Sequence, residues 1–442
     1  MESASVAGEV PRLAEGTELI GEYQGSGFQE PRYILRRADG QVIQLPRLLY
    51  VLAANLDGRR DLGQVAALLC AELGRVVQAE QVSYLIENRL RPVGIVATDP
   101  DAGAPTITMT SDPLLALKFR VGVVPERTVW HIARVFGPMF LSPVILTTLA
   151  AFVTSDMLII TRGGVAQIMP SAVTLVTQPV LTLLVLAMIL TSAAFHECGH
   201  VSACRYGGAR PGVMGFGLYL VWPALYSTVT DSYRLSRAGR LRTDLGGVYF
   251  NAVFLAGMSL AYLATGAPWL LVAIVVLHIE TVTQFLPMIR LDGYYILSDL
   301  IGVPDLFSRM GPVLRSMIPG QATHPRVLEL KPWVRRTITL WVVIVVPCLL
   351  YWVVGFVIVV PRVMPIVWTR LVELSQAVGT AAAVGSVAQV TWGVIEIVLL
   401  LLPWVGSLLL LGMMVRSWVT RGVGGAGGSR PPPRHPGRPL PG

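Results

Sequence analysis

The chain has 442 residues, of which 53% are hydrophobic and 14% are charged. Soluble domains carry about 25% charged residues, so this composition excludes an ordinary soluble protein and indicates extensive contact with lipid. The net charge of +8 is uneven, because residues 1–111 carry a net charge of −4 and the remainder carries +12. The basic excess falls in loops between apolar stretches, which favours a lipid bilayer and not nucleic acid as the partner.

The four cysteines are not spaced as a metal or disulfide framework. No pair has the CxxC spacing, so we expect neither a zinc knuckle nor a set of disulfides. Cys198 and Cys204 are interpreted as small packing residues and not as ligands. The first 30 residues are polar and contain no apolar segment, which argues against a cleavable signal peptide.

The N-terminal part of the chain predicts a small α+β domain. Residues 1–31 are expected to be a flexible leader. The next residues predict two strands around Asp39-Gly40, three short helices and a final strand, at 32–45, 46–57, 61–74, 79–91 and 93–96. This order fits a winged-helix-like cytosolic domain over residues 32–97, followed by a linker at 98–112.

The rest of the chain predicts an all-α polytopic membrane domain over residues 113–421. Six stretches have the roughly 20 apolar residues that a span needs, near 137–160, 178–203, 245–264, 268–287, 338–361 and 392–415. Lys and Arg gather in alternate loops, so the positive-inside rule places both termini in the cytoplasm. Residues 422–442 are rich in Gly and Pro and are expected to be a disordered tail.

An HExxH sequence, His196–His200, lies at the cytoplasmic end of the second predicted span. Positions i and i+4 share a helix face, so His196 and His200 can bind one metal ion. Glu197 lies on the adjacent side, where its carboxylate can take a proton from a metal-activated water. The alternative is two interface histidines with an incidental Glu, but three polar groups in an apolar stretch are costly.

A third metal ligand must come from elsewhere, because catalytic zinc has three protein ligands and one open position. Asp292 follows the fourth predicted span at the same membrane end as the HExxH sequence, which favours it over a simple turn residue. His278 and Glu280, within the fourth span, are rival candidates. Polar contacts between helices are the simpler interpretation of both.

Residues 212–226 are apolar but rich in glycine, which disfavours a helix. Two interpretations stay open for this segment. It forms either a re-entrant strand or loop over the active site, whose edge an extended substrate could pair with, or a loop at the membrane interface.

The two separated motifs, His196–His200 and Asp292-Gly293, resemble the site-two protease superfamily of intramembrane zinc metallopeptidases. Pro287–Tyr295 with Ser298-Asp299 is similar to one branch, the peptide zinc metalloproteases encoded with peptide-maturation and export systems. The resemblance covers about residues 113–310, with further similar stretches at 216–231 and 244–251. It implies one zinc per chain, held by His196, His200 and Asp292, with Glu197 as the catalytic base.

One position departs from that branch. Leu286 stands where the branch commonly has an Asn before the proline, a residue that would donate to the substrate carbonyl or its oxyanion. Gln284 and Asn251 are candidates to supply that donor. Separately, residues 32–97 resemble the PqqD-like domain that recognises leader peptides of ribosomally made peptides.

These observations predict an integral-membrane zinc metalloendopeptidase that cleaves a membrane-associated or ribosomally made precursor peptide. A peptide-export system is a further expected partner. Two alternatives remain. A transporter subunit would use His278, Glu280 and Glu396 as an ion path, and a catalytically inactive export scaffold would bind peptide without cutting it.

Overall fold

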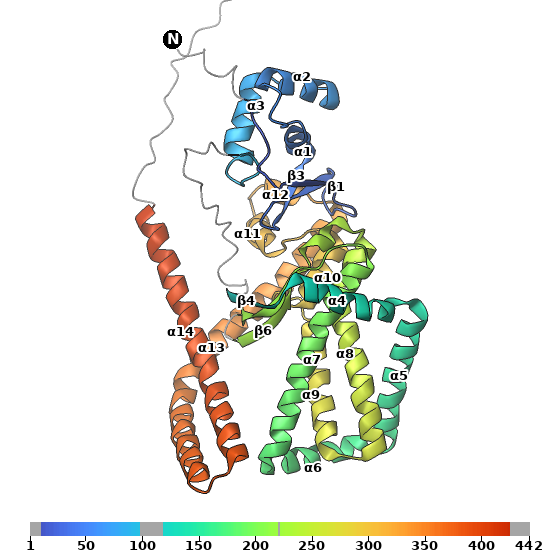
Figure 1. Ribbon diagram of the computed structural model, residues 1–442. Coiled ribbons are helices and arrows are strands. Elements are labelled where there is room, and N and C mark those ends of the chain that lie inside the picture. Colours follow the sequence, from blue (N-terminus) through green and yellow to red (C-terminus); the bar gives the residue numbers. More distant parts are fainter. Residues whose placement is uncertain (1–9, 98–117, 220–221, 425–442) are drawn as a thin grey trace, which may run out of the picture.

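The computed structural model describes residues 10–97, 118–219 and 222–424. The fold is mostly helical, with a small N-terminal domain stacked on one end of a helical body (Figure 1). We call residues 10–97 the head and residues 118–424 the body. The predicted linker at 98–112 and all but the first residues of the predicted tail lie outside the described residues; residues 422–424 end the last helix.

The head combines an antiparallel sheet, in the order β1-β2-β3, with three short helices. The elements are β1 (Glu18–Glu22), β2 (Arg32–Arg36), β3 (Val42–Pro46), α1 (Arg47–Ala54), α2 (Leu62–Leu73), α3 (Ala79–Leu85) and a π-helical turn, Ile86–Leu90. Asp61 begins α2 with a capping box, and Gly74, in the left-handed region, ends it. Leu35, Leu52 and Leu69 are fully buried in a core between sheet and helices.

Two expectations for the head are wrong. Residues 10–31 are not a flexible leader, because they contain β1, which pairs with β2, and the fully buried Tyr23. The predicted strand at 93–96 is reduced to an isolated bridge between Val96 and Leu13. The N-terminal segment thus completes the sheet.

The body begins with β4 (Lys118–Val124), α4 (Glu126–Phe136) and a short 3-10 turn, Gly137–Phe140. A bundle follows, made of α5 (Ser142–Thr161), α6 (Gly164–Thr177), α7 (Pro179–Tyr206), α8 (Arg237–Thr265) and α9 (Pro268–Gln284). Between α7 and α8 lie β5 (Met214–Tyr219), β6 (Trp222–Ser227) and a 3-10 turn, Thr230–Arg234. Short helices α10 (Asp292–Ile301), α11 (Phe307–Ser316) and α12 (Pro325–Leu328) lie between the bundle and the head (Figure 1).

Two long helices complete the body. They are α13 (Pro332–Ala383) and α14 (Val387–Gly424), which form a hairpin beside the bundle (Figure 1). α13 continues through Pro347, Pro361 and Pro365, and α14 contacts both α7 and β6.

Five helices are long and apolar enough to cross a membrane: α5, α7, α8, α13 and α14. α9 is apolar but has only 17 residues. The fourth predicted span, 268–287, is therefore not confirmed by length, although most of each of the six predicted stretches is helical. Large apolar side chains on these helices, such as Leu146, Leu350 and Trp352, are exposed in the isolated chain. The protein is an integral membrane protein on this evidence.

The described part of residues 212–226 is mostly two paired antiparallel strands, β5 and β6. β5 pairs with β6 on one side and with β4 on the other, giving a sheet in the order β4-β5-β6. Met214 of β5 packs in a small cluster with Val201 of α7 and Val129 of α4, and Cys198 lies against the same cluster. The sheet therefore rests on the part of α7 that carries the HExxH sequence.

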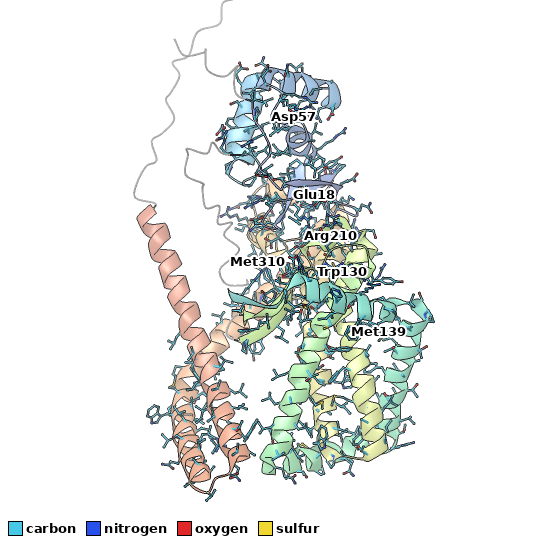
Figure 2. The ribbon with its side chains drawn as sticks, viewed as in Figure 1. Glu18, Asp57, Trp130, Met139, Arg210 and Met310 are labelled. Atoms are coloured by element: carbon cyan, nitrogen blue, oxygen red, sulfur yellow. The ribbon has the colours of Figure 1, made fainter. Side chains whose placement is uncertain are left out.

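The head meets the body through both charged and apolar contacts. Figure 2 places Glu18 at the lower side of the head and Arg210 of the body directly below it. Arg36 of β2 bridges Glu18 and the buried Asp231 of the body, and Arg234 contacts the same two carboxylates. Such a network fixes the orientation of the head more firmly than a single exposed ion pair does.

Candidate metal centre

The C-terminal part of α7 brings the two motif histidines together. His196 and His200 are one helical turn apart, both are buried, and their Nε2 atoms lie 3.1 Å from each other. This is the geometry that the i, i+4 spacing predicts.

Asp292 completes a cluster of three potential ligands. It is the first residue of α10, and its Oδ2 lies 3.1 Å from Nε2 of His196 while its Oδ1 lies 3.4 Å from Nε2 of His200. One ligand atom from each residue falls within 4.8 Å of the others. The structure therefore brings together His196, His200 and Asp292, as the sequence predicts.

One face of α8 orients both imidazoles. Nδ1 of His200 donates to the main-chain oxygen of Thr243 at 2.8 Å, and Nδ1 of His196 donates to Oδ1 of Asn251 at 3.2 Å. The side-chain nitrogen of Asn251 donates to Thr281 and Gln284, which assigns its oxygen as the acceptor. Both Nδ1 atoms therefore carry a proton, which leaves both Nε2 atoms, directed into the cluster, as the atoms that can bind a metal.

Close packing of α7 on α8 depends on glycines. A Cβ on Gly199, inside the HExxH sequence, would lie 2.2 Å from the main-chain oxygen of Gly246. A Cβ on Gly247 would lie 2.4 to 2.5 Å from ring atoms of both His196 and His200. Glycine at these positions lets the α8 backbone approach the imidazoles directly.

A glycine also fixes the position of Asp292. A Cβ on Gly293 would lie 2.1 Å from the main-chain oxygen of Phe285, at the end of α9. The start of α10 can therefore approach the end of α9, and Asp292 reaches the histidines on α7. This close approach explains why the Asp is followed by Gly.

The donor set and spacing fit a zinc ion. Ligand atoms bound at about 2.0–2.1 Å in a tetrahedron are roughly 3.3 Å apart, close to the separations among these three residues. Burial alone would raise the pKa of Asp292, but the imidazoles of His200 and His196 hold that pKa well below its usual range. The carboxylate of Asp292 is thus ionised, and a carboxylate with two imidazoles that give up their Nε2 protons on binding is a ligand set that zinc prefers.

Glu197 lies beside the cluster and not within it. It follows His196 on α7, its side chain is half-buried, and it is not one of the three converging residues. This arrangement leaves its carboxylate free to act on a water or a substrate.

The other candidates have different surroundings. Nε2 of His278 contacts Oδ2 of Asp156 on α5 at 2.9 Å, so His278 makes the interhelix contact expected of it. Glu280 and Glu396 are not part of the three-residue cluster. Cys204 is fully buried in a small apolar cluster, and both motif-proximal cysteines are free thiols.

Sequence reasoning missed two residues of α8 and assigned a different role to a third. Thr243 contributes only its main-chain oxygen, which leaves no signal in the sequence. Gly247 was visible only as part of a Gly-Gly pair. Asn251 was considered as a donor to substrate, yet its oxygen orients His196 and its nitrogen is used by Gln284. The amide nitrogen of Gln284 therefore remains the candidate donor to the substrate carbonyl, in place of the Asn that Leu286 replaces.

The comparisons with known proteins give one distant relative. No family model matches the chain, and no solved structure matches it. The chain is 26% identical over 129 residues to a Bacillus subtilis (strain 168) protein named "Putative peptide zinc metalloprotease protein YydH". The match covers 29% of this chain and 51% of the relative, so it spans about half of that protein's length. This distant relationship supports a site-two protease-like metalloprotease.

The close approach of Gly247 generates a prediction. Gly247→Ala should weaken zinc binding on the order of 10–100-fold, because the added methyl group pushes both imidazoles from the cluster. Gly257→Ala is the matched control, since it lies on the same helix with open space around it. Zinc affinity of the purified proteins is measured by chelator competition. Equal affinities for the two variants would contradict the proposed close packing.

Proposed function

We propose that the protein is an intramembrane zinc metalloendopeptidase whose catalytic domain spans residues 113–421. The observation that carries this proposal is the convergence of His196, His200 and Asp292, from two helices, with Glu197 beside them. The name of the distant relative agrees with this chemistry. One zinc ion per chain is the proposed cofactor.

The proposed mechanism assigns a role to each residue. His196, His200 and Asp292 hold the zinc, which when bound polarises the substrate carbonyl and lowers the pKa of a water toward ~7. Glu197 accepts the proton of the attacking water and returns it to the leaving amine. Asn251 and the Thr243 carbonyl keep the imidazoles in the correct tautomer and orientation. The amide nitrogen of Gln284 is proposed to donate to the carbonyl oxygen.

The sheet in the body supports a peptide as substrate. A helical segment hides its amides within its own hydrogen bonds, so it must become extended before water can attack. β4 and β6 form the two edges of a sheet that packs on α7, and β6 contacts that helix. An extended substrate is proposed to pair with an edge of this sheet next to the zinc ligands.

The two alternatives have weaker support. An ion path through His278, Glu280 and Glu396 would need these side chains to follow one another across the membrane. His278 instead contacts Asp156 on α5 through its Nε2 atom. A catalytically inactive scaffold has no need for a complete set of oriented ligands, since binding alone does not require two imidazoles in one tautomer. Cleavage of a precursor peptide is therefore the preferred reading.

The decisive experiment separates metal binding from turnover. Wild-type protein should contain about one zinc per chain, as the single three-ligand cluster among the described residues implies. Glu197→Gln should keep the zinc but lose cleavage on the order of 10²–10⁴-fold, because an amide cannot accept the water's proton. Metal analysis and cleavage of a precursor peptide in detergent or nanodiscs measure the two effects.

His196→Ala and Asp292→Ala serve as companions in that experiment. Both should lose or weaken zinc, because each removes one ligand of three. Zinc-free wild-type protein would end the metalloprotease proposal. Full zinc content in Asp292→Ala would show that the third ligand is another residue. Undiminished turnover in Glu197→Gln would show that Glu197 is not the general base.

We also propose that both termini and the metal centre lie on the cytoplasmic side. The C-terminal end of α7 and helix α10 lie at the same end of the bundle as the head (Figure 1), and Lys and Arg are concentrated in the loops of that end. Reporter fusions after residue 112, within 228–236, within 305–330 and after residue 420 should all report cytoplasm. A periplasmic signal from the fusion within 228–236 would overturn this orientation.

The part of the head at residues 32–97 is proposed to bind the precursor peptide and deliver it to the body. β3 is an edge strand of the head sheet, and an edge can accept an extended peptide by main-chain pairing. Export machinery is the proposed further partner, because the branch that the chain resembles is encoded with peptide-export systems.

Binding by the head is tested with the full chain carrying Glu197→Gln, so that the peptide stays intact. A fluorescein-labelled leader segment of a candidate precursor should bind with micromolar affinity in an anisotropy titration. Hydrogen exchange at the β3 amides should slow when the leader is added, because edge pairing protects them. Absence of binding, or protection confined to the body, would contradict a role for the head in recognition.

A further inference from the structure

A segment of the head is inserted into the body. Residues 23–29, which we call the docking segment, follow β1 directly and pass between α8, α10 and the start of α13. The main-chain nitrogen of Gly27 donates to the oxygen of Gly302 at 2.9 Å, and that of Lys331 donates to the oxygen of Gly27 at 3.0 Å. Phe28 forms a bridge with Leu330 and lies in the apolar core around α10 and α13.

The docking segment is in backbone contact with the end of α10. A Cβ on Gly27 would lie 2.2 Å from the oxygen of Ile301, and a Cβ on Gly302 would lie 2.2 Å from the oxygen of Gly25. Ile301 is the last residue of α10 and Gly302, at φ 72°, ends it. The position of the docking segment and the position of α10 therefore depend on each other.

Tyr23 connects the docking segment to a buried ion pair. Its hydroxyl donates to Oδ1 of Asp299 at 3.1 Å, and its ring lies under the guanidinium of Arg240 at 4.2 Å. Nε of Arg240 donates to the same oxygen of Asp299 at 3.0 Å, while its Nη2 donates to the oxygen of Gln24 at 3.0 Å. Tyr23 and Arg240 are both fully buried. Burial raises the pKa of Tyr23 far above its usual value, so its hydroxyl remains a donor.

Asp299 lies on the helix that carries a metal ligand. Asp292 and Asp299 are seven residues apart, which is two turns, or roughly 10 Å, along one face of α10. That face meets α8, which supplies Arg240 at one level and the two imidazole acceptors, Thr243 and Asn251, further along. Holding Asp299 against Arg240 therefore fixes the height and rotation of Asp292 relative to the histidines.

We propose that Tyr23 and Arg240, acting through Asp299, are positioning residues for the zinc ligand Asp292. The metal centre is then complete only when the head is docked, and the N-terminal segment is part of the catalytic unit. This inference rests on the proposed metal site. It goes beyond that site, because it predicts that the hydroxyl of Tyr23, which lies in the head and outside the cluster, affects metal affinity.

The test uses the full chain with Tyr23→Phe, which keeps the ring under Arg240 and removes only the donor to Asp299. Zinc affinity by chelator competition should fall on the order of tenfold, as for other outer-sphere partners of ligands. The absorption spectrum of the cobalt-substituted protein should change, because the Asp292 oxygen moves. With peptide substrate, kcat should fall while KM stays near the wild-type value. Arg240→Lys, which keeps the charge but not the fork that reaches Asp299 and Gln24, should act in the same direction.

Two controls match this variant. Tyr33→Phe removes a hydroxyl from the same domain, where the ring stacks on Tyr50, and should leave zinc affinity and the cobalt spectrum unchanged. Gln29→Ala removes docking contacts with the oxygens of Leu328 and Leu330, away from Asp299, and should have little effect on either. Thermal unfolding of every variant separates loss of fold from loss of positioning.

The outcomes distinguish this inference from the proposed function. Wild-type zinc affinity and cobalt spectrum in Tyr23→Phe would overturn the inference while leaving the metalloprotease intact. An equal loss in Gln29→Ala would also overturn it, because docking in general and not the bond to Asp299 would then be responsible. Wild-type protein that binds no zinc would overturn the proposed function and, with it, the positioning role.

Discussion

The close contact between α7 and α8 is the constraint on which the candidate site depends. Gly199, Gly246 and Gly247 remove the side chains that would separate the two helices, and the α8 backbone lies directly against both imidazoles. In lipid, where apolar side chains gain little by leaving the solvent, such close packing and interhelical hydrogen bonds hold helices together. The same contact gives His196 and His200 their acceptors, so packing and ligand orientation are set by one interface.

A second constraint is the cost of charge inside the body. Arg240 is fully buried, and an isolated buried guanidinium would be strongly destabilising. Asp299 supplies the opposite charge, Leu235 and Gln24 accept from the remaining nitrogens, and Tyr23 covers the ion pair. Two of these partners come from the head. The body therefore satisfies its buried charge with the help of the head, which is a physical reason for the two to form one unit.

The sequence predicts those parts of the fold and of the candidate site that depend on residues close together in the chain or on long apolar stretches. The i, i+4 histidines need only a helix, and the apolar stretches predict helices by length, so both were accessible. Topology favoured Asp292 as the candidate third ligand, and the structure brings it to the histidines. β1 was missed because its strand exists only through pairing with β2. The polar start of α8, from Arg237 to Asp244, was missed because its buried charge, Arg240, is paired with Asp299, which is distant in sequence.

The arrangement of the site relative to the sheet has a consequence for how a peptide would be processed. The cluster of ligands lies at the end of the bundle where the β4-β5-β6 sheet and the head also lie (Figure 1). A substrate that became extended along the sheet would present its amides near Glu197 without the unfolding of a segment deep in the membrane, which avoids the cost of unpaired backbone groups in lipid. Proteolysis at this end is thus compatible with a bilayer because the extended backbone can exchange its own hydrogen bonds for those of a strand edge.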